Sequence, residues 1–594
     1  MSGIAGIINM NPSKLNPQDF DRFFSCILVN KCTKMSITKI KNSSFIGVGE
    51  LEFFEPKYYE SSNEQKKVWV WGDFFISDES KQKTKLEKLF ALLNQESIPF
   101  EKISGHYIIA YWDENSKKFG LFNSSFGMMP LYYAIKNNCL YFSSRLKSFI
   151  DAKLFPIDLN KNAILQYLIF NYVVSNDSFI KDVKLLPAST HIFSHEKEWS
   201  VVRYDNHHWL FNAPTVSFSE GEKLLDEALG EIISHYSELY KPFCCSITGG
   251  FDSRLNLSYL NNLGESDLFT YTYGKKSHSD MKVSAMLAKK VGVSHLPVFL
   301  DDDFVNSYVE LAESCIQLSD GIRAANRGHY LLMAYRITEF GGKIAISGNC
   351  ASNLMKIVVK PSSAYNKYVI GLFKGDGALP DCASDVYKSF FLENPWIKEI
   401  SNKEVFVESI RNSEILTSKE LNTSKRFYHY LLTNCERKYF GAEIASYASY
   451  IYNYSPFIDS DFIRIFAQTP YYGGHYNFLE SNLLLRNKPV RLYAKLMKKN
   501  DSILARFTSG RGYPVTWFLS YAGLAGAYAI KKLGLNPFAD KDPDPFNHKK
   551  GFTSIQRSWA LESRYFNHPD GPFYSDEIVK AYSISKWIKN GSLL

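Results

Sequence analysis

A change of hydrophobic pattern near residue 205 constrains the fold of this chain more than any other feature. Before that point, short runs such as GIAGIIN, KVWVWGDFFIS and GHYIIAYWD are bounded by turns, and several runs alternate apolar and polar residues. This pattern is typical of half-buried antiparallel strands. Residues 1–205 therefore predict an α+β domain that contains packed antiparallel sheets.

Beyond residue 222, helical segments alternate with apolar strands. The sequences FCCSIT, DLFTYTY, SHLPVFL and KIAISG are expected to be strands, and the chain after residue 400 is mainly helical in pattern. Such alternation predicts an α/β domain with a doubly wound parallel sheet and a helical C-terminal part, over residues 223–594. Residues 206–222 lose periodicity and contain a proline, so they are the predicted linker.

Composition narrows the class of protein. A chain of 594 residues is too long for one core. The net charge of +8 is spread without a basic run, so no nucleic-acid partner is expected. Nine irregularly spaced cysteines without a C-x-x-C pair, and an N-terminus without signal-peptide character, predict a reduced, cytoplasmic protein.

One uncharged stretch, PVTWFLSYAGLAGAYAI at 514–530, is at the short limit for crossing a bilayer. Its proline, glycines, serine and threonine favour a buried helix. Membrane contact is therefore not expected.

The sequence ITGGFDSR, 247–254, joins a predicted strand to a predicted helix. Glycines in such a turn allow backbone N–H groups to approach an anion closely, and the following helix N-terminus adds a positive dipole end. We expect a nucleotide polyphosphate to bind at five residues of this turn: Thr248, Gly249, Gly250, Asp252 and Ser253. Asp252 is the predicted magnesium ligand, because a lone carboxylate would repel phosphate. A tight turn with a capping aspartate is the simpler alternative.

The same residues resemble the pyrophosphate-binding S-G-G-x-D-S loop of the asparagine synthetase family. Other segments resemble family motifs in family order: MSGIAGII at the start, FNSSFGMMPLYY, FSSRLKSF, AKKVGVSH, AISGNCASNLMK and YSPFIDSDFI. Asp280 and His295 also fall at family-like positions, although a surface aspartate and a packed histidine would explain them equally well. The resemblance covers about 500 residues.

The resemblance implies a glutaminase domain of the N-terminal-nucleophile (Ntn) type, followed by an ATP-pyrophosphatase (PP-loop) synthetase domain. Family enzymes use ATP and Mg²⁺ to adenylate a carboxylate, release pyrophosphate and let an amine attack the acyl-adenylate. The chain resembles divergent members such as β-lactam synthetases and lasso-peptide cyclases, which use an amine of the substrate itself.

The predicted glutaminase site departs from the family pattern. Ser2 stands where the family has its cysteine nucleophile, and Trp71-Gly72-Asp73 replaces Asn-Gly-Glu. An indole cannot supply the amide that stabilises an oxyanion. Ser104 replaces the aspartate that precedes the glycine at 105. These changes predict a degenerate glutaminase.

The predicted synthetase site is mixed. In its second loop, Asn349, Ser352 and Asn353 replace three carboxylates, which predicts weaker magnesium binding. Thr508 replaces the family lysine that neutralises the adenylation transition state, and Arg506 and Arg511 are the candidate catalytic replacements beside Asp252.

Three functions follow as hypotheses. The first is an ATP-dependent, AMP-forming carbon–nitrogen ligase, whose carboxylate and amine belong to a small molecule or a peptide. The second is a nucleotide-binding or scaffold protein of the same fold without turnover. The third is a hydrolase that uses Ser2 as nucleophile. A homodimer or a partner protein stays open.

Overall fold

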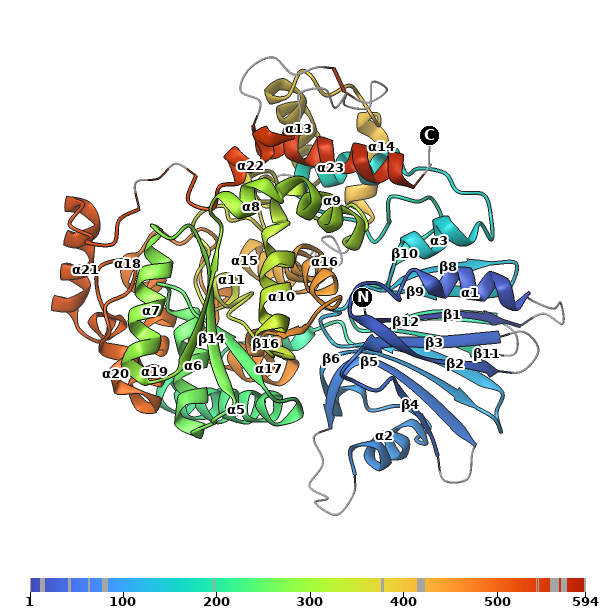
Figure 1. The fold of residues 1–594 in the computed structure, drawn as a ribbon, viewed down its shortest axis with the longest axis horizontal. Helices are drawn as coiled ribbons and strands as arrows, with labels where there is room; N and C mark the ends of the chain where they lie inside the picture. The colour runs from blue at the N-terminus through green and yellow to red at the C-terminus, as the bar shows by residue number, and fades with distance from the viewer. Residues whose placement is uncertain are drawn as a thin grey trace.

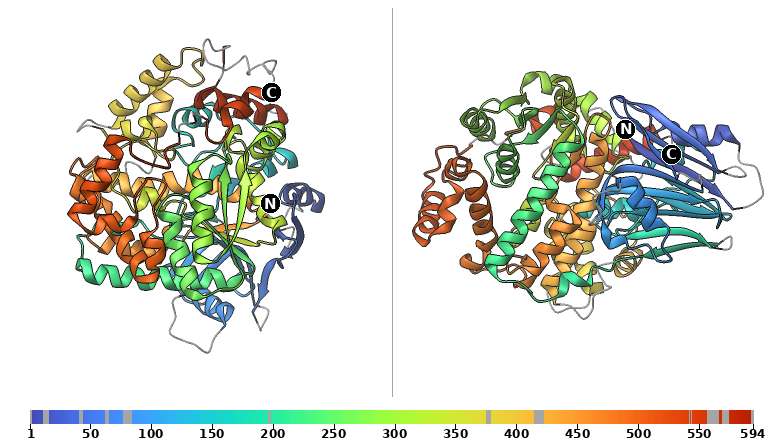
Figure 2. Two further views of the ribbon diagram at one scale, coloured as in Figure 1. Left: turned by 60° about the vertical axis from the view of Figure 1, so that its left-hand side comes forward. Right: turned by 90° about the horizontal axis from the view of Figure 1, so that it is seen from below.

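The structure is a computed structural model that describes residues 2–10, 16–40, 44–61, 65–76, 84–195, 198–374, 379–413, 422–540, 542, 544–555, 566–567 and 574–591. The N-terminal sheets lie to one side of a larger part that is rich in helices (Figures 1 and 2). None of the described helices combines the length and the apolar character needed to cross a membrane.

The first part contains two six-stranded sheets in which every described pairing is antiparallel. The first sheet has the order β10 (Lys184–Leu185), β8 (Tyr132–Lys136), β9 (Cys139–Ser143), β1 (Gly3–Asn9), β3 (Ser44–Leu51), β2 (Cys32–Ile40). The second has the order β12 (Glu198–Arg203), β11 (Thr190–His195), β7 (Lys118–Asn123), β6 (Ile103–Asp113), β5 (Lys66–Ile76), β4 (Lys57–Glu60). The predicted antiparallel sheets are confirmed.

The two sheets share a core, to which Ile4 and Val48 contribute from one sheet and Trp71 and Ile108 from the other. Helices α1 (Pro17–Ser25) and α3 (Lys147–Ala152) pack on the outer face of the first sheet, and α2 (Lys85–Leu93) packs on that of the second. Because successive strand residues point to opposite faces, each sheet buries both faces.

The second part is built on a five-stranded sheet whose described pairings are all parallel, which confirms that prediction. Its order is β15 (Ser294–Phe299), β14 (Leu268–Gly274), β13 (Phe243–Ser246), β16 (Ile344–Ile346), β17 (Tyr452–Tyr454). Cys244 and Cys245 on β13 belong to different cores, so helices cover both faces of the sheet. The edge strand β17 lies in the region that the sequence predicted as mainly helical.

Local signals explain where the helices around this sheet begin and end. The first helices are α5 (Phe218–Leu239), α6 (Asp252–Leu263), α7 (Ser279–Val291), α9 (Tyr308–Leu318) and α10 (His329–Glu339). Ser217 accepts a hydrogen bond from the Glu220 backbone and begins α5 inside the predicted linker. Gly264 and Gly292 end α6 and α7 with positive φ.

The C-terminal part adds many helices to this framework. They include α13 (Leu379–Glu393), α14 (Lys403–Arg411), α15 (Thr423–Tyr430), a π-helix η6 (Leu431–Glu436), α16 (Arg437–Tyr447), α17 (Ser460–Gln468), α19 (Lys488–Asn500), α20 (Ser502–Arg506), α21 (Tyr521–Leu533) and α23 (Asp576–Asn590).

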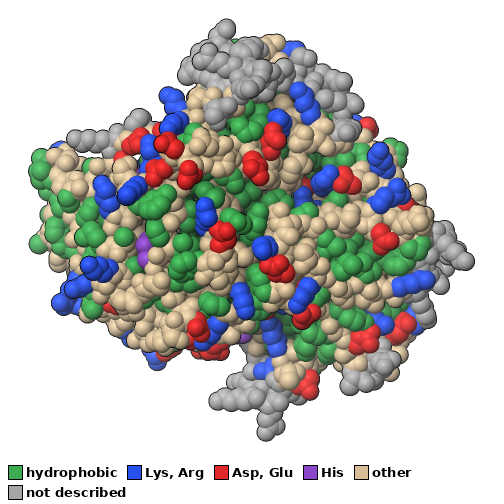
Figure 3. Space-filling model, viewed as in Figure 1, with side chains coloured by type: hydrophobic (Ala, Val, Ile, Leu, Met, Phe, Trp, Pro, Cys, Tyr) green, Lys and Arg blue, Asp and Glu red, His purple; other side chains and the backbone are tan. Residues whose placement is uncertain are grey.

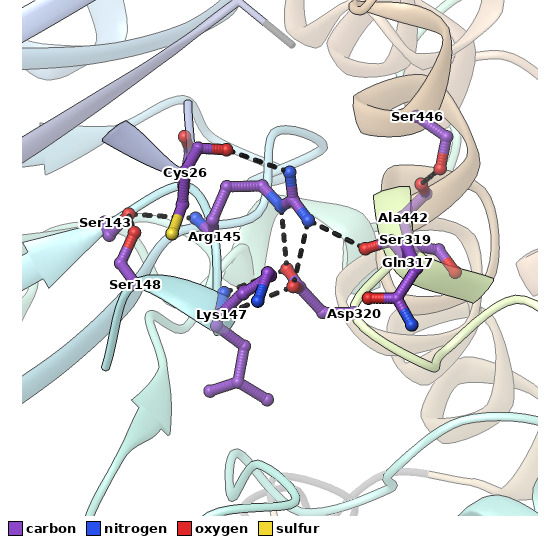
Figure 4. A network of polar contacts seen from close by, with 12 residues as sticks. Cys26, Ser143, Arg145, Lys147, Ser148, Gln317, Ser319, Asp320, Ala442 and Ser446 are labelled. Carbon is purple, nitrogen blue, oxygen red and sulfur yellow. Dashed lines mark hydrogen bonds and ion pairs between the residues drawn. The ribbon is translucent and has the colours of Figure 1, made fainter. Parts of the chain in front are cut away.

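A buried ion pair joins the two parts (Figure 4). Arg145, from the FSSRLKSF motif, contacts both carboxylate oxygens of Asp320 at 3.3 Å and donates to the carbonyls of Cys26 and Gln317. The backbone N–H groups of residues 146 and 147 also donate to Asp320. Because both charges are fully hydrogen-bonded, removal of either partner would leave an uncompensated buried charge.

The expected buried helix at 514–530 is wrong. This stretch divides at Ser520 into a 3₁₀ helix, η9 (Val515–Leu519), and the first part of α21. In α21, Ala527 is the buried residue, whereas Tyr521 is 75% exposed. Ala527, Leu524 and Ile530 pack in or against the core, and the other side of α21 lies on the surface.

Candidate functional site

The glycine turn lies at the centre of the parallel sheet. Strand β13 ends at Ser246, residues 247–251 form the turn, and α6 begins at Asp252. The sheet continues to β14 on one side and to β16 on the other, so the turn is at the point where the strand order reverses. Ligands of open α/β sheets bind beyond the strand ends at such a point.

Two loops meet at this point. Gly348, which follows β16, lies so close to the start of α6 that a Cβ atom there would be 3.1 Å from the Ser253 nitrogen. The loop after β13 and the loop after β16 therefore lie side by side.

The glycine turn is held by its own side chains. The Thr248 N–H donates to Ser253 Oγ at 3.1 Å, and the Gly250 N–H donates to Thr248 Oγ1 at 3.1 Å. The Gly249 N–H donates to Asp280 Oδ1 at 2.7 Å, so Asp280 supports the turn. A Cβ atom at Gly249 would lie 2.7 Å from that oxygen, which explains the need for glycine.

The N-terminal end of α6 has no side-chain cap among the described residues. Its backbone N–H groups carry the positive end of the helix dipole, which favours an anion. The N-terminal end of α6 is therefore the part of the turn that is available to a phosphate. The preceding N–H groups of Thr248, Gly249 and Gly250 already donate to protein oxygens.

Asp252 forms an ion pair that the sequence did not predict. Lys356 Nζ lies 3.2 and 3.3 Å from the two carboxylate oxygens of Asp252. The side chains are 20% and 25% exposed, so both are accessible to a ligand. The buried Tyr493 lies beside them, and burial together with the Asp252 charge raises the pKa of its hydroxyl.

These residues do not fit a magnesium ion held by the protein. Asp252 is already paired with an ammonium group, and no group of three His, Cys, Asp or Glu side chains is placed to hold a metal within the described ranges. Tight magnesium sites use carboxylate charge and several oxygen ligands. Magnesium binding at Asp252 therefore stays a prediction, and the ion pair with Lys356 argues against it.

The loop that contains Thr508 and Gly510 lies against the glycine turn. The Gly510 N–H donates to the Gly249 carbonyl at 2.9 Å. Arg254, the last residue of ITGGFDSR, donates to the carbonyls of Phe507 and Thr508 at 2.8 and 3.1 Å. Burial lowers the pKa of this guanidinium to about 10. Arg254 thus fixes the loop to α6.

The two predicted catalytic arginines occupy different places. The Arg511 guanidinium carbon lies 5.5 Å from the centre of the Phe251 ring, which places this exposed side chain beside the glycine turn. Arg506 is the last residue of α20 and is exposed, and no contact with the turn is present among the described residues. The structure therefore brings Arg511 to the predicted site, but not Arg506.

The second loop receives a carboxylate from another element. Asn353 Nδ2 donates to Glu436 Oε1 at 2.8 Å. Glu436 ends the π-helix η6, is fully buried, and has its pKa raised to about 7 by burial. Single π-turns are frequent at functional sites. No local sequence signal points to Glu436, because it lies 83 residues from Asn353 in the chain.

A second buried cluster surrounds Glu443. Glu443 Oε2 accepts hydrogen bonds from Arg323 at 3.0 Å and from Arg327 at 2.8 Å. Burial alone would raise the pKa of Glu443, but the two guanidinium groups outweigh it and lower that pKa. Both arginines also line a polar cavity of about 330 Å³, together with Asp576 and Lys580.

The predicted glutaminase site is closed by its own side chains. Ser2 is fully buried, and its hydroxyl accepts a hydrogen bond from Trp71 Nε1 at 3.2 Å. The Ser2 N–H donates to the Ala448 carbonyl at 2.6 Å. The indole of Trp71 is itself fully buried, so it fills the space beside Ser2.

Asp73, next to this site, is paired with two lysines. Lys57 Nζ lies 3.6 Å from Asp73, and Lys85 forms a closer ion pair with it. Burial would raise the pKa of Asp73, but the two ammonium groups lower it overall. At the positions of the family Asn-Gly-Glu motif, Trp71 therefore contacts Ser2 and Asp73 contacts two lysines.

Comparison with known proteins supports the family resemblance. Residues 86–205 match a glutamine amidotransferase domain family. The chain is 24% identical over 211 residues to "Asparagine synthetase [glutamine-hydrolyzing] 1" of Bacillus subtilis (strain 168). The match covers 34% of this chain and 32% of that protein, so the chain spans about a third of the length of this relative.

Similarity to solved structures is slight. The glutamine phosphoribosylpyrophosphate amidotransferase of B. subtilis, complexed with ADP and GMP, has a TM-score of 0.24 at 10% identity, covering 50% of this chain and 65% of that chain. A structure described as the allosteric regulatory enzyme of purine biosynthesis has a TM-score of 0.24 at 11% identity, covering 41% and 60%.

The domain match and the curated relative agree with the motifs. The fold combines antiparallel sheets with a parallel-sheet part, and the domain match covers residues within the antiparallel part. Over part of its length the chain is therefore similar to an asparagine synthetase, and residues 86–205 are similar to a glutamine amidotransferase domain.

Proposed function

We propose that this protein is an ATP-dependent ligase that forms an amide bond and releases AMP and pyrophosphate. The observation that carries the proposal is the arrangement at the sheet centre, where Asp252, Lys356 and the N-terminal end of α6 meet. An ammonium group and a helix N-terminus next to a glycine turn suit a polyphosphate.

In the proposed reaction, a carboxylate oxygen of the substrate attacks the α-phosphorus of ATP. The bond to the β,γ-pyrophosphate breaks, and pyrophosphate leaves with the electron pair. An amine then attacks the acyl carbon, loses a proton and displaces AMP. Lys356 and Arg511 would balance the charge that develops on the phosphate oxygens, because both cations lie beside the turn.

The proposal does not include glutamine hydrolysis. The hydroxyl of Ser2 faces an indole N–H, and the lysine-paired Asp73 lies near this site. In the proposal the amine therefore belongs to a small molecule or a peptide. The same contacts oppose a hydrolase that uses Ser2, because its hydroxyl is fully buried and already accepts a hydrogen bond from the Trp71 indole.

A protein of the same fold without turnover is the second candidate. It is favoured by the internal contacts of the turn, where Asp280 occupies the Gly249 N–H and Lys356 occupies Asp252. If these contacts persist in solution, the turn is a structural element. The cytoplasm remains the proposed location for either function.

Thermal unfolding with ATP separates the two candidates. We expect ATP at about 100 times its dissociation constant to stabilise the wild type by about 2.7 kcal/mol, and AMP to stabilise it less. The shift should be measured with Mg²⁺ and with EDTA, for the wild type and for Asp252→Ala. Loss of the shift in Asp252→Ala and in EDTA would assign magnesium to Asp252, whereas a shift that persists in both would assign the phosphates to Lys356 and the end of α6. Asp267→Ala, a substitution outside the site in the loop before β14, is the control.

Pyrophosphate release completes the test. Incubation of the wild type with ATP and a panel of carboxylates and amines should release pyrophosphate and AMP in equal amounts. A melting shift without any pyrophosphate release would favour the second candidate. The absence of a shift at millimolar ATP would contradict the ligase proposal.

A further inference from the structure

The surface helix α21 is unusual in its exposure. Four large side chains of its outer face and its C-terminal extension are well exposed: Tyr521 at 75%, Tyr528 at 54%, Leu533 at 67% and Leu535 at 63%. Isolated exposed apolar residues are ordinary, but a helix of 13 residues with Ala527 as its buried residue is not. The helix lies at the side of the molecule farthest from the N-terminal sheets (Figures 1 and 2).

The chain segment that contains α21 carries charges of one sign. Residues 502–539 contain Arg506, Arg511, Lys531 and Lys532 and no aspartate or glutamate. Lys531 and Lys532 lie in the last turn of α21 and are exposed. In the space-filling view, apolar side chains cover the edge of the molecule at α21, and basic side chains lie around them (Figure 3).

The composition of the exposed face also indicates its partner. Tyrosine has an apolar ring and a polar hydroxyl, and such residues are enriched where a protein meets the headgroup region of a lipid layer. Lysine can bury its aliphatic part and keep its ammonium group among anionic headgroups. A second copy of the chain would bring its own lysines to the face, with no acidic residue of 502–539 to pair with them.

We propose that α21 binds the surface of a membrane that contains anionic lipids. The helix would lie in the plane of the headgroups, with Tyr521, Tyr528 and Leu533 inserted and Lys531 and Lys532 at the phosphate level. This docking site is distinct from the glycine turn and does not depend on the proposed ligase activity. It also places the loop of Gly510 near the membrane, because Tyr513 and Trp517 stack between that loop and α21.

The full-length protein can be tested by sedimentation with vesicles. We expect it to bind vesicles of phosphatidylcholine and phosphatidylglycerol, to bind pure phosphatidylcholine vesicles far more weakly, and to lose binding as salt rises. Equal binding to both vesicle types, or no binding to either, would overturn the proposal. This comparison requires no variant.

Two variants test the helix itself. Tyr528→Ser with Leu533→Ser, and Lys531→Glu with Lys532→Glu, should each weaken binding at least tenfold. The matched control is Lys289→Glu with Lys290→Glu, because these lysines also lie exposed in the last turn of a helix of 13 residues, α7. If the control variant lost vesicle binding equally, the effect would come from the net charge of the protein and not from α21, and the proposal would be overturned.

A second copy of the chain is the competing occupant of the exposed face of α21. Sedimentation-velocity runs without lipid should show the same mass for the wild type and for Tyr528→Ser with Leu533→Ser. A wild-type dimer that this variant dissociates would assign the face to a second copy and overturn the lipid proposal.

Discussion

Asp73 in the N-terminal pocket and Asp252 at the glycine turn are both paired with lysine, but they differ in exposure. The Asp73 side chain is 3% exposed, whereas those of Asp252 and Lys356 are 20% and 25% exposed. A buried pair cannot exchange partners without a large desolvation cost, whereas an accessible pair can open toward a ligand. The difference in exposure predicts that the glycine turn, and not the surroundings of Asp73, is open to a ligand.

Glu436 adds a third case to this comparison. It is buried like Asp73, but its side-chain partners among the described residues include Asn353 and Cys350 and no cation. Burial therefore raises its pKa, whereas two lysines lower that of Asp73. The environment, and not the residue type, decides the charge of a carboxylate at neutral pH.

The largest expected effect is the loss of charge at Asp73. Asp73→Asn leaves two lysines without their carboxylate, so we expect the free energy of unfolding to fall by about 3 kcal/mol. Urea unfolding measures this change. Asp182→Asn is the control, because its pair with Lys136 is exposed at both ends and should change stability by less than about 1 kcal/mol. Equal effects in the two variants would remove the distinction between buried and accessible pairs.

The next effect concerns pH. The pKa of Glu436 is about 7 in the folded state against an ordinary value of 4.5, so between these values the folded state holds a proton that the unfolded state has released. Stability therefore falls as pH rises through this window, by about 3 kcal/mol at 1.36 kcal/mol per pKa unit.

Glu436→Gln should remove that slope, so the variant should gain stability relative to wild type between about pH 5 and pH 8. Urea unfolding at several pH values measures it. Glu443→Gln should instead lose stability at neutral pH, because Glu443 is paired with two arginines and its pKa is lowered. A Glu436→Gln variant whose stability follows the wild type at every pH would show that Glu436 does not titrate in this window.

At the accessible pair, Lys356→Met tests whether the ammonium group faces a ligand. If Lys356 binds phosphate, ATP affinity should fall about tenfold, since a hydrogen bond to a charged group contributes about 1.5–3 kcal/mol. Calorimetric titration measures the affinity, and exposed Lys360→Met is the control. Tighter binding of ATP by Lys356→Met would show that Lys356 pairs with Asp252 and does not contact the nucleotide.

The smallest expected effect separates the two arginines. Arg511→Ala should weaken ATP binding about two- to fivefold, because Arg511 is an exposed cation beside the turn. Arg506→Ala should leave the affinity unchanged. A loss in Arg506→Ala alone would mean that the loop adopts another arrangement when nucleotide binds.

Much of the fold could be predicted from the sequence because its signals are local. Alternating strands, continuous apolar strands and helical repeats depend on neighbouring residues, and both sheet types are confirmed. The short edge strand β17 was missed because three residues, Tyr452–Tyr454, show no period of their own. The uncharged helix α21 was misjudged because apolar sequence alone does not say whether a partner helix covers it.

The sequence by itself determined the glycine turn, because a strand, two glycines and a helix start are consecutive in the chain. It also determined the change at Trp71, whose indole cannot replace an amide. Only the tertiary structure decided that Lys356 reaches Asp252, that Glu436 reaches Asn353 and that Arg511 alone of the two arginines lies at the turn. These contacts join residues about 80 to 260 positions apart, and packing of separate elements, which no local pattern encodes, sets their distances.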